Sequence, residues 1–401
     1  MLTVVSKNFA PQVSGTPILL ANLFSGYPGR LNAIAGYDLY GKSDPSFLPP
    51  CPTKYLALPR ILAGLYDRLR IKSPATTSRA LRPSVRRVLR KLGTSVVFGV
   101  YPRDDYFVAA FLAARDLGLP FYAHMHDLWI ENLTPGSPLA RFAAKWEPII
   151  IREARRVLCM TEAMQKYYEK KYGVQTDLLP HTIREQNALN VTVRPPAMPG
   201  PTALFVGAVS PPMNLDALKV LAAASELLPS GYELLFCTSM DLQALKQQGI
   251  QSSRLRAQYV SRAEVQRLQS GAHVLIAPLS HKNGSTEEVQ TVFSTKLCEY
   301  LVSGRPIIVF APEDSYHAES ARKNGWAYVV TEDSPAALAE AIMKVVTKED
   351  LAAGLVRAAL QEAYSRSARR HAERLHEWVL EDTRTALSLE GQRSGRQLAV
   401  S

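Results

Sequence analysis

The segment Phe293-Ser-Thr-Lys-Leu-Cys-Glu-Tyr-Leu-Val-Ser-Gly-Arg-Pro-Ile-Ile-Val309 predicts a polar loop, a short amphipathic helix, a glycine stop and a buried strand. Ser294 and Thr295 are residue types that cap helix N-termini, and Gly304 follows the last helical position. A helix start that carries these residues and Lys296 directs backbone N–H groups and a positive dipole end outward. Such a start suits an anion such as a diphosphate.

Glu299 lies one turn further along the same helix, where its carboxylate could accept hydrogen bonds from a ribose. The alternative is an ordinary helix–strand unit with polar residues on its surface. The spacing fits both, so the remainder of the chain decides between a ligand site and a structural unit.

Short apolar runs alternate with longer helical patterns along almost the whole chain. In the first half the expected strands are residues 2–5, 95–100, 120–123, 156–160 and 176–179. In the second half they are residues 203–206, 232–237, 255–260, 273–277, 307–310 and 327–330. This alternation is typical of an α/β protein in which helices cover both faces of parallel sheets.

The segment 184–201 interrupts the alternation with four prolines and no clear periodicity, which predicts an interdomain linker. We expect an N-terminal Rossmann-like domain over residues 1–190, a linker over 191–201 and a second such domain over 202–365. A C-terminal helix over 366–387, crossing back to the first domain, and a disordered tail over 388–401 complete the organisation. Ligands of doubly wound sheets bind outside the carboxyl ends of the strands, so two such domains predict a cleft between them.

Composition narrows the class of protein. With 47% hydrophobic and 21% charged residues the chain is typical of globular proteins, and no apolar run approaches the roughly 20 residues of a membrane span. The N-terminus enters an apolar strand at once, which argues against a secretory signal and favours a cytoplasmic location. The cysteines are scattered without metal-ligand spacing, so we expect no metal site and no cofactor. They are Cys51, Cys159, Cys237 and Cys298.

The net charge of +11 is concentrated in one segment. Residues 54–91 hold eleven Lys or Arg against one acid, Asp67, which gives +10. Apolar residues alternate with the basic ones, so the segment could bind an anionic membrane surface at the inner face, each basic residue contributing about 1 kcal/mol. The alternative is a solvated basic face. Nucleic-acid binding is disfavoured because no base-reading motif accompanies the charge.

Four stretches, in this order, carry a resemblance to a known family. They are FAPQVSGTP at 9–17, HMHDLW at 124–129, VLCMTEAM at 157–164 with LPHTI at 179–183, and FVGA at 205–208 with the segment 293–309. Together they resemble the GT-B glycosyltransferases of family 4, in the variant with a TK-x-x-EY sequence, over about residues 1–380. The resemblance implies two Rossmann-like domains that face each other across a cleft.

The resemblance also implies a nucleotide-sugar donor bound in the second half of the chain, without a metal. The diphosphate would lie at Ser294, Thr295 and Lys296, and the ribose at Glu299. Gly207 would permit close approach of the donor. The base would stack near Val260, where a strand ends.

In the first half the resemblance assigns Gly15 and Thr16 to the loop that faces the donor. His126 would position the sugar or polarise the donor. Asp127 would orient His126, or would itself be the base of an inverting enzyme. We expect His126, Asp127 and Lys296 to be the catalytic residues.

The chain departs from the family pattern in three ways. His181 stands where an asparagine is usual. The first acidic residue of the usual Glu-x(7)-Glu pair would fall at Thr291, although Glu287 and Glu288 lie upstream and could substitute. The basic pair that usually follows the first strand of the donor domain is also missing. Lys296 and Glu299 therefore have to provide more of the donor binding.

We expect a glycosyltransferase, of the retaining type by resemblance, that acts on a glycan or lipid-linked acceptor in cell-surface polysaccharide or glycolipid synthesis. Two alternatives remain. One is a nucleotide-sugar epimerase with the same fold, and the other is a non-catalytic relative that binds a glycan or a nucleotide.

Overall fold

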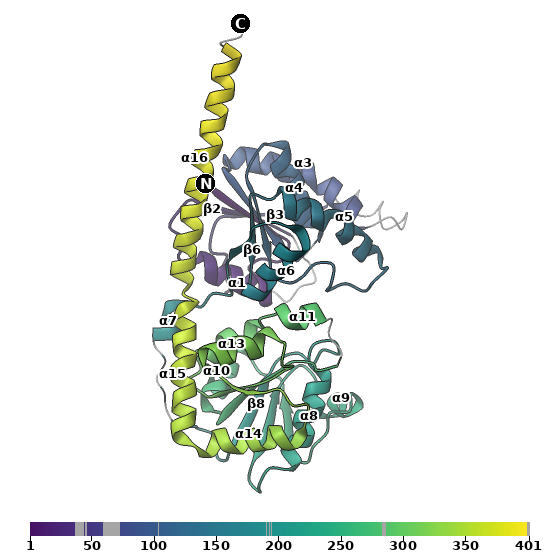
Figure 1. Cartoon of the computed structure of the whole chain (residues 1–401), viewed down its shortest axis with the longest axis vertical. Helices are drawn as coiled ribbons and strands as arrows, with labels where there is room; N and C mark the ends of the chain where they lie inside the picture. The colour runs from purple at the N-terminus through teal and green to yellow at the C-terminus, as the bar shows by residue number, and fades with distance from the viewer. Residues whose placement is uncertain are drawn as a thin grey trace. The chain divides into compact units, whose positions relative to one another are not determined.

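The computed structural model describes residues 1–36, 44, 46–58, 73–102, 104–189, 191, 193, 195–282 and 286–398. The chain forms two compact units (Figure 1). The N-terminal unit consists of Met1–Thr182 together with the segment from Ala368 onward. The C-terminal unit is Ile183–Ser367. Among the helices described, none is long and apolar enough to cross a membrane.

A seven-stranded parallel sheet forms the centre of the N-terminal unit, in the order β3-β2-β1-β4-β5-β6-β7. Its strands are β1 (Leu2–Ser6), β2 (Leu31–Gly36), β3 (Thr53–Leu56), β4 (Val96–Tyr101), β5 (Phe121–Met125), β6 (Arg156–Cys159) and β7 (Asp177–Leu178). Its helices are α1 (Gly15–Phe24), α3 (Pro74–Leu92), α4 (Asp104–Asp116), α5 (Pro138–Glu153), α6 (Glu162–Tyr172) and α16 (Ala368–Leu398). This is the doubly wound arrangement that the alternating pattern predicts.

Buried side chains fill both faces of this sheet, because successive residues of a strand point to opposite sides. On β4, Val97 joins the apolar cluster that includes residues of α3, α4 and α5. Its neighbour Phe98 joins the other cluster, with residues of α1 and α16 such as Trp378.

Two strands of this sheet, β2 and β3, are absent from the sequence-based expectation. The sequence of β2 is LNAIAG, which is poor in β-branched residues, and only parallel pairing with β1 and β3 makes it a strand. The β3 strand, TKYL, lies at the start of the basic segment, which the charge pattern alone treats as one continuous surface element. Lys54 thus belongs to an edge strand, and residues 59–72 of that segment lie outside the described part of the chain.

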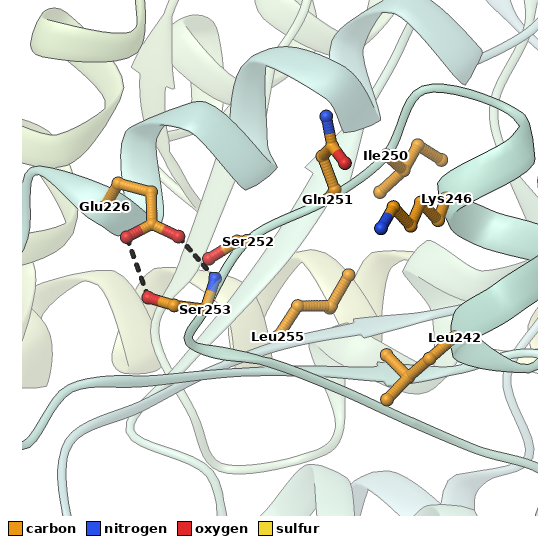
Figure 2. Close-up of a pocket in the computed structure, with 8 residues that line it drawn as sticks. All are labelled: Glu226, Leu242, Lys246, Ile250, Gln251, Ser252, Ser253 and Leu255. Atoms are coloured by element: carbon orange, nitrogen blue, oxygen red, sulfur yellow. Dashed lines mark hydrogen bonds between the residues drawn. The ribbon is translucent and has the colours of Figure 1, made fainter.

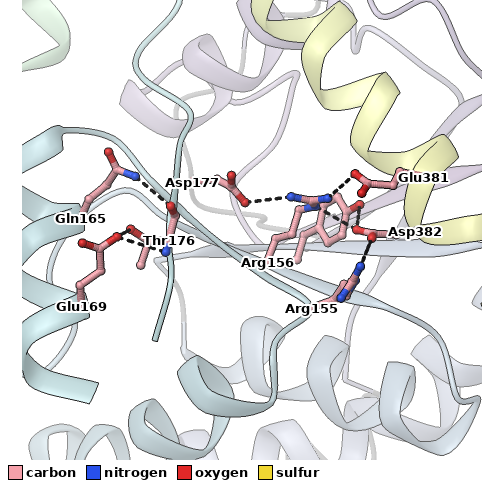
Figure 3. Close-up of polar contacts among 9 residues, drawn as sticks. Arg155, Arg156, Gln165, Glu169, Thr176, Asp177, Glu381 and Asp382 are labelled. Atoms are coloured by element: carbon pink, nitrogen blue, oxygen red, sulfur yellow. Dashed lines mark hydrogen bonds and ion pairs between the residues drawn. The ribbon is translucent and has the colours of Figure 1, made fainter. Parts of the chain in front are cut away.

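The C-terminal helix α16 is anchored to the N-terminal unit by a buried carboxylate (Figure 3). Asp382 is 1% exposed and accepts hydrogen bonds from Tyr122 Oη at 2.6 Å, Arg155 Nε at 2.7 Å and Arg156 Nε at 2.9 Å. Arg156 also pairs with Glu381 at 2.8 Å. The predicted return of the C-terminal helix to the first domain is confirmed.

The C-terminal unit contains a six-stranded parallel sheet in the order β10-β9-β8-β11-β12-β13. Its strands are β8 (Thr202–Val206), β9 (Glu233–Cys237), β10 (Leu255–Gln258), β11 (Val274–Pro278), β12 (Ile307–Phe310) and β13 (Tyr328–Val330). Its helices are α7 (Glu185–Leu189), α8 (Leu215–Glu226), α9 (Leu242–Gln247), α10 (Arg262–Gly271), α11 (Thr286–Thr291), α12 (Thr295–Leu301), α13 (Tyr316–Asn324), α14 (Pro335–Thr347) and α15 (Glu349–Ser365).

The chain enters and leaves the C-terminal unit at neighbouring residues. The Ile183 N–H donates to the Arg366 carbonyl oxygen at 2.8 Å, and Ile183 forms a parallel bridge with Ser367. Two helices, α15 and α16, are separated at this point. The α16 helix continues to Leu398, where the pattern predicts a disordered tail, because an anchored helix extends without a new nucleation step.

Candidate functional site

The segment 293–309 forms the predicted helix, stop and strand at the carboxyl edge of the C-terminal sheet. Tyr300 holds the helix α12 against this edge. Its buried hydroxyl accepts a hydrogen bond from the Val206 N–H at 2.9 Å and donates to the Ile276 carbonyl oxygen at 3.4 Å. Gly304 ends the segment's helical part with φ +71°, which a glycine adopts without strain. The α12 helix therefore spans the ends of β8 and β11.

Lys296 projects from α12 over the end of β8. Its Nζ lies 5.5 Å from the centroid of the Phe205 ring. A Cβ on Gly207, whose φ is +148°, would lie only 1.6 Å from that Nζ. Burial lowers the pKa of the Lys296 ammonium to about 8, with the charge of Glu299 opposing the shift. Gly207 thus makes room for the lysine side chain. Its predicted role, to permit close approach of the donor, stays a prediction.

Ser294 occupies the N-cap position of α12, but its side chain makes no capping hydrogen bond. Its backbone N–H instead donates to His317 Nε2 at 3.1 Å. The helix has only seven residues, so the predicted dipole contribution of Ser294 and Thr295 is small, and Lys296 is the main positive charge at this place.

Glu299 lies on the same helix, one turn after Lys296, and is half-buried. Gln269 of α10, a 2% exposed side chain, donates to Glu299 Oε2 at 3.5 Å. At the position of the missing acid, the Thr291 hydroxyl donates to the Glu287 carbonyl oxygen at 2.8 Å within α11. That hydroxyl therefore bonds to the backbone of its own helix.

Two cavities open beside Lys296 at this edge. A small one of about 40 Å³ is lined by residues that include Asn214, Ser294, Lys296, Tyr300 and His317. A larger one of about 240 Å³ is lined by residues that include Gly207, Thr238, Ser239, Tyr259 and Val260. The predicted base-stacking residue Val260 and the predicted glycine Gly207 therefore border the same cavity.

The larger cavity offers both an aromatic surface and a hydroxyl. The Tyr259 ring is 71% exposed, and the Thr238 side chain is 4% exposed. Within the described residues the Thr238 Oγ1 has no hydrogen-bond partner. A buried hydroxyl is usually satisfied, so this atom is available to a ligand.

A third pocket, of about 440 Å³, lies at the opposite, amino edge of the same sheet (Figure 2). It is open, and its polar groups are partly used internally, since Glu226 accepts from the Ser253 hydroxyl at 2.9 Å. Lys246 is its only basic lining residue. Because ligands of doubly wound sheets bind at the carboxyl edge, we assign no role to this larger pocket.

In the N-terminal unit, two histidines lie on the same face of β5 and its extension. His124 Nε2 lies 3.5 Å from the Leu179 carbonyl oxygen, so this nitrogen carries the proton. His124 Nδ1 then accepts from His126 Nε2 at 3.1 Å, which leaves His126 Nδ1 as an acceptor. Burial lowers the pKa of His124 to about 3 and lowers that of His126, with His124 and His181 adding to the latter shift. Both rings are therefore neutral at pH 7.

Asp127 follows His126 and is half-buried. Burial raises the pKa of this carboxyl to about 6. Trp129, the last residue of the quoted motif, is fully buried and donates to Asp104. The Trp is thus a core residue that fixes the loop after β5.

Gly15 is the first residue of α1 and is exposed, and Thr16 beside it is half-buried. The Ser14 side chain makes no capping bond to this helix. The predicted residues form two sets, one in each unit. The first is Gly15, Thr16, His126 and Asp127, and the second is Gly207, Val260, Ser294, Thr295, Lys296 and Glu299.

Sequence reasoning assigned no role to His317, Thr238, Gln269 and Tyr300. Tyr300 carries a local signal, because a polar aromatic next to Glu299 in an otherwise apolar helix face predicts a buried hydroxyl with partners. The others lie on elements remote in sequence and carry no local signal.

Comparisons with known proteins agree with this architecture. The family described as "Glycosyl transferase 4-like domain" matches residues 34–180, and the family described as "Glycosyl transferases group 1" matches residues 200–348. These matches together cover most of the chain. The protein belongs to the family 4, group 1 glycosyltransferases of the GT-B fold and is a transferase. No curated protein gives a significant match.

Among solved structures, HepE (Alr3699) of Anabaena in complex with UDP is similar, with a TM-score of 0.66 and 14% identity, covering 95% of this chain and 99% of that one. Sucrose-phosphate synthase of Thermosynechococcus elongatus has a TM-score of 0.65 and 15% identity, with 100% of both chains covered. A glycosyltransferase of Rickettsia africae has a TM-score of 0.62 and 13% identity, covering 95% and 97%. At these identities the likeness confirms the fold.

Proposed function

We propose that this enzyme transfers a sugar from a nucleotide-sugar donor, with retention of configuration and without a metal, to a glycan or lipid-linked acceptor of cell-surface polysaccharide or glycolipid synthesis. The observation that carries the proposal is the placement of the Lys296 ammonium over Gly207, beside two cavities at the carboxyl edge of a doubly wound sheet. Such an edge is where nucleotides bind in these folds.

The donor fits the C-terminal unit as follows. The base enters the cavity of about 240 Å³, where Tyr259 offers a ring for stacking and Thr238 a hydroxyl. Glu299, already oriented by Gln269, accepts the ribose hydroxyls. The diphosphate lies between these groups at Lys296. UDP sugars are the first donors to test, because the similar HepE structures contain UDP and UDP-glucose.

Glycosyl transfer builds negative charge on the leaving diphosphate. A cation placed there in advance, in a partly water-excluded site, stabilises the transition state more than the ground state. With a pKa of about 8, Lys296 is mostly protonated at pH 7, and a bound dianion would raise that pKa further. The lysine can therefore supply the charge that a metal supplies in other transferases. Within the described residues no cluster of His, Cys, Asp or Glu is arranged to hold a metal.

In the N-terminal unit, His126 presents Nδ1 as a neutral hydrogen-bond acceptor. An acceptor of this kind suits a sugar hydroxyl, which donates. We therefore propose that His126 positions the sugar, and that Asp127 and the loop at Gly15 and Thr16 contribute to the same site.

The basic surface of the N-terminal unit supports the lipid-linked acceptor. The α3 helix carries six basic residues and no acid, and Arg82 pairs with Asp116. Its apolar residues Leu81, Val85 and Leu89 are buried in the core. The helix therefore meets an anionic membrane through charge and not through insertion, each basic residue contributing about 1 kcal/mol.

Flotation with liposomes tests this surface. The Arg87→Ala/Arg90→Ala variant should lose preference for anionic lipid, whereas Arg115→Ala, whose side chain pairs with Glu153, should not. Equal binding of neutral and anionic liposomes by the wild type would refute the membrane proposal.

The enzymatic proposal is tested by donor turnover. Lys296→Ala and Glu299→Ala should each lower turnover by about tenfold or more, equal to about 1.4 kcal/mol of transition-state stabilisation. Lys246→Ala, in the pocket at the amino edge, is the matched control and should keep wild-type turnover. Unchanged turnover in both site variants would refute the site. A panel of nucleotide sugars separates the alternatives, since an epimerase alters the sugar without an acceptor and a binding relative turns over none.

A further inference from the structure

His317 of α13 lies beneath the loop that leads into α12. Its Nε2 accepts the hydrogen bond from the Ser294 backbone N–H at 3.1 Å, and the side chain is 2% exposed. The same imidazole lines the cavity of about 40 Å³ together with Lys296. The Phe293–Ser294 peptide, two residues before Lys296, is thus held by a side chain from another helix.

The hydrogen bond fixes the state of the imidazole. An Nε2 that accepts carries no proton, so the proton is on Nδ1. Burial, together with the nearby Arg366 guanidinium, lowers the pKa of His317 to about 4. The ring is therefore a neutral acceptor at physiological pH.

Phe293, the residue before Ser294, is fixed through contacts of its ring. The Arg366 guanidinium carbon lies 3.8 Å from the centroid of its ring, and Arg366 Nε donates to Glu362 at 2.8 Å. The Phe293 ring also contacts the His317 ring edge to face, with centroids 5.9 Å apart. Two consecutive residues are therefore held in place, Phe293 through its ring and Ser294 through its backbone N–H.

We propose that His317 is a positioning residue of the donor site. By accepting from the Ser294 N–H it sets the orientation of the Phe293–Ser294 peptide at the start of α12. The helix then presents Lys296, two residues later, to the diphosphate of a nucleoside diphosphate in one fixed geometry. This inference rests on the proposed function. It adds a residue that contacts neither sugar nor base and acts through Ser294.

Two substitutions separate this role from simple packing. In His317→Gln the side-chain amide oxygen reaches about the position of Nε2 and can still accept, whereas His317→Leu fills similar space without an acceptor. His273→Leu is the matched control in the same unit. His273 also accepts a backbone N–H through a ring nitrogen, from Thr202 at 3.2 Å, but at the amino edge of the sheet.

The first readout needs no nucleotide. Hydrogen exchange of the 292–297 amides should be faster in His317→Leu than in the wild type and in His317→Gln, and unchanged in His273→Leu. Equal exchange in His317→Leu and wild type would overturn the inference, whatever the enzyme binds.

The second readout uses UDP binding and donor kinetics. His317→Leu should weaken UDP and raise the donor KM by about tenfold, with a smaller change in kcat, and His317→Gln should recover most of the affinity. His273→Leu should lower the melting temperature by about as much as His317→Leu does, without changing the KM for the donor. Wild-type failure to bind UDP, GDP or ADP would refute the proposed function instead. Binding by the wild type with an equal KM in His317→Leu would refute only the role of His317.

Discussion

The ammonium of Lys296 occupies the space in which any side chain at residue 207 would begin. A Cβ on Gly207 would lie 1.6 Å from Lys296 Nζ, and the Gly207 backbone has φ +148°. The glycine at the end of β8 and the lysine at the start of α12 therefore form one unit of the site. Neither residue can change without affecting the other.

Gly207→Ala should displace Lys296 and lower donor turnover by about tenfold or more, through loss of about 1.4 kcal/mol of interaction with the diphosphate. The control is Gly231→Ala, because Gly231 also has a positive φ, +89°, but a Cβ there meets nothing within 4 Å. Both variants carry backbone strain of about 1–3 kcal/mol. An equal loss of turnover in the two variants, relative to the wild type, would show that backbone strain and not displacement of the lysine causes the loss.

The lowered pKa of Lys296 predicts a distinct alkaline limb in nucleotide binding. Below pH 8 the ammonium is charged, and above that pH its charge is progressively lost. If Lys296 binds the diphosphate as proposed, UDP affinity should fall through about pH 8. Lys296→Arg should remove this limb, since the guanidinium stays charged. Titrations of UDP binding from pH 6.5 to about 9.5 measure it. An identical limb in the arginine variant would assign it to another group.

The same lysine predicts an opposite trend in stability. Its folded pKa of about 8 lies below the ordinary value of 10.5, so the unfolded chain binds more protons between these two pH values. The free energy of unfolding should therefore rise with pH across this interval relative to Lys296→Met. Urea unfolding of both proteins at matched pH gives the difference. A constant difference would mean that the folded pKa is not lowered.

The two α/β sheets and most of their helices follow from local pattern, as β12 and α6 illustrate. The β12 strand has the predicted bounds, and Thr161, a residue type that favours helix N-caps, accepts the Met164 N–H at 3.0 Å at the start of α6. The β2 strand could not be predicted, since its neighbours in the sheet and not its composition make it a strand. Tertiary pairing has no local signature when the residues are Ala, Asn and Gly.

The candidate site likewise contains residues that the sequence identifies and residues that it does not. Lys296 and Glu299 are recognisable because their spacing places both on one face of a helix. His317 and Thr238 are not, because each lines a cavity that only the fold assembles, His317 the one of about 40 Å³ and Thr238 the one of about 240 Å³. The contact between Gly207 and Lys296 is likewise visible only in the fold, because the sequence does not show which side chain occupies the space beside a glycine.

The paired histidines predict that His124 acts through His126. His124→Phe removes the acceptor of the His126 Nε2–H and leaves that buried donor unpaired, at a cost of about 1–3 kcal/mol. We expect kcat to fall by about tenfold with little change in UDP affinity, because the proposed sites of the donor base and diphosphate lie in the other unit. Thr3→Val is the control, since it breaks a buried hydrogen bond of 2.8 Å to Thr94 at the amino edge. A comparable loss of kcat in Thr3→Val would indicate general destabilisation.

The contacts of Asp382 predict that the stability of the N-terminal unit depends on the C-terminal helix α16. Burial opposes ionisation of this carboxyl, but hydrogen bonds from Tyr122, Arg155 and Arg156 outweigh it and hold its pKa below the ordinary value. Removing one partner of such a buried pair costs about 3–5 kcal/mol, so Asp382→Ala should strongly lower the unfolding free energy of this unit at pH 7.

The pH dependence of this loss has a defined sign. Because the folded pKa is depressed, the stabilisation is present above the ordinary carboxyl pKa and disappears as the pH falls through the folded value. The difference between wild type and Asp382→Ala should therefore shrink in acid. The control is Glu381→Gln, whose carboxylate pairs with the same Arg156 but is 62% exposed, and which should cost no more than about 1 kcal/mol. Hydrogen exchange along α16 reports on this unit alone, and equal losses in the two variants would show that burial of Asp382 does not set its contribution.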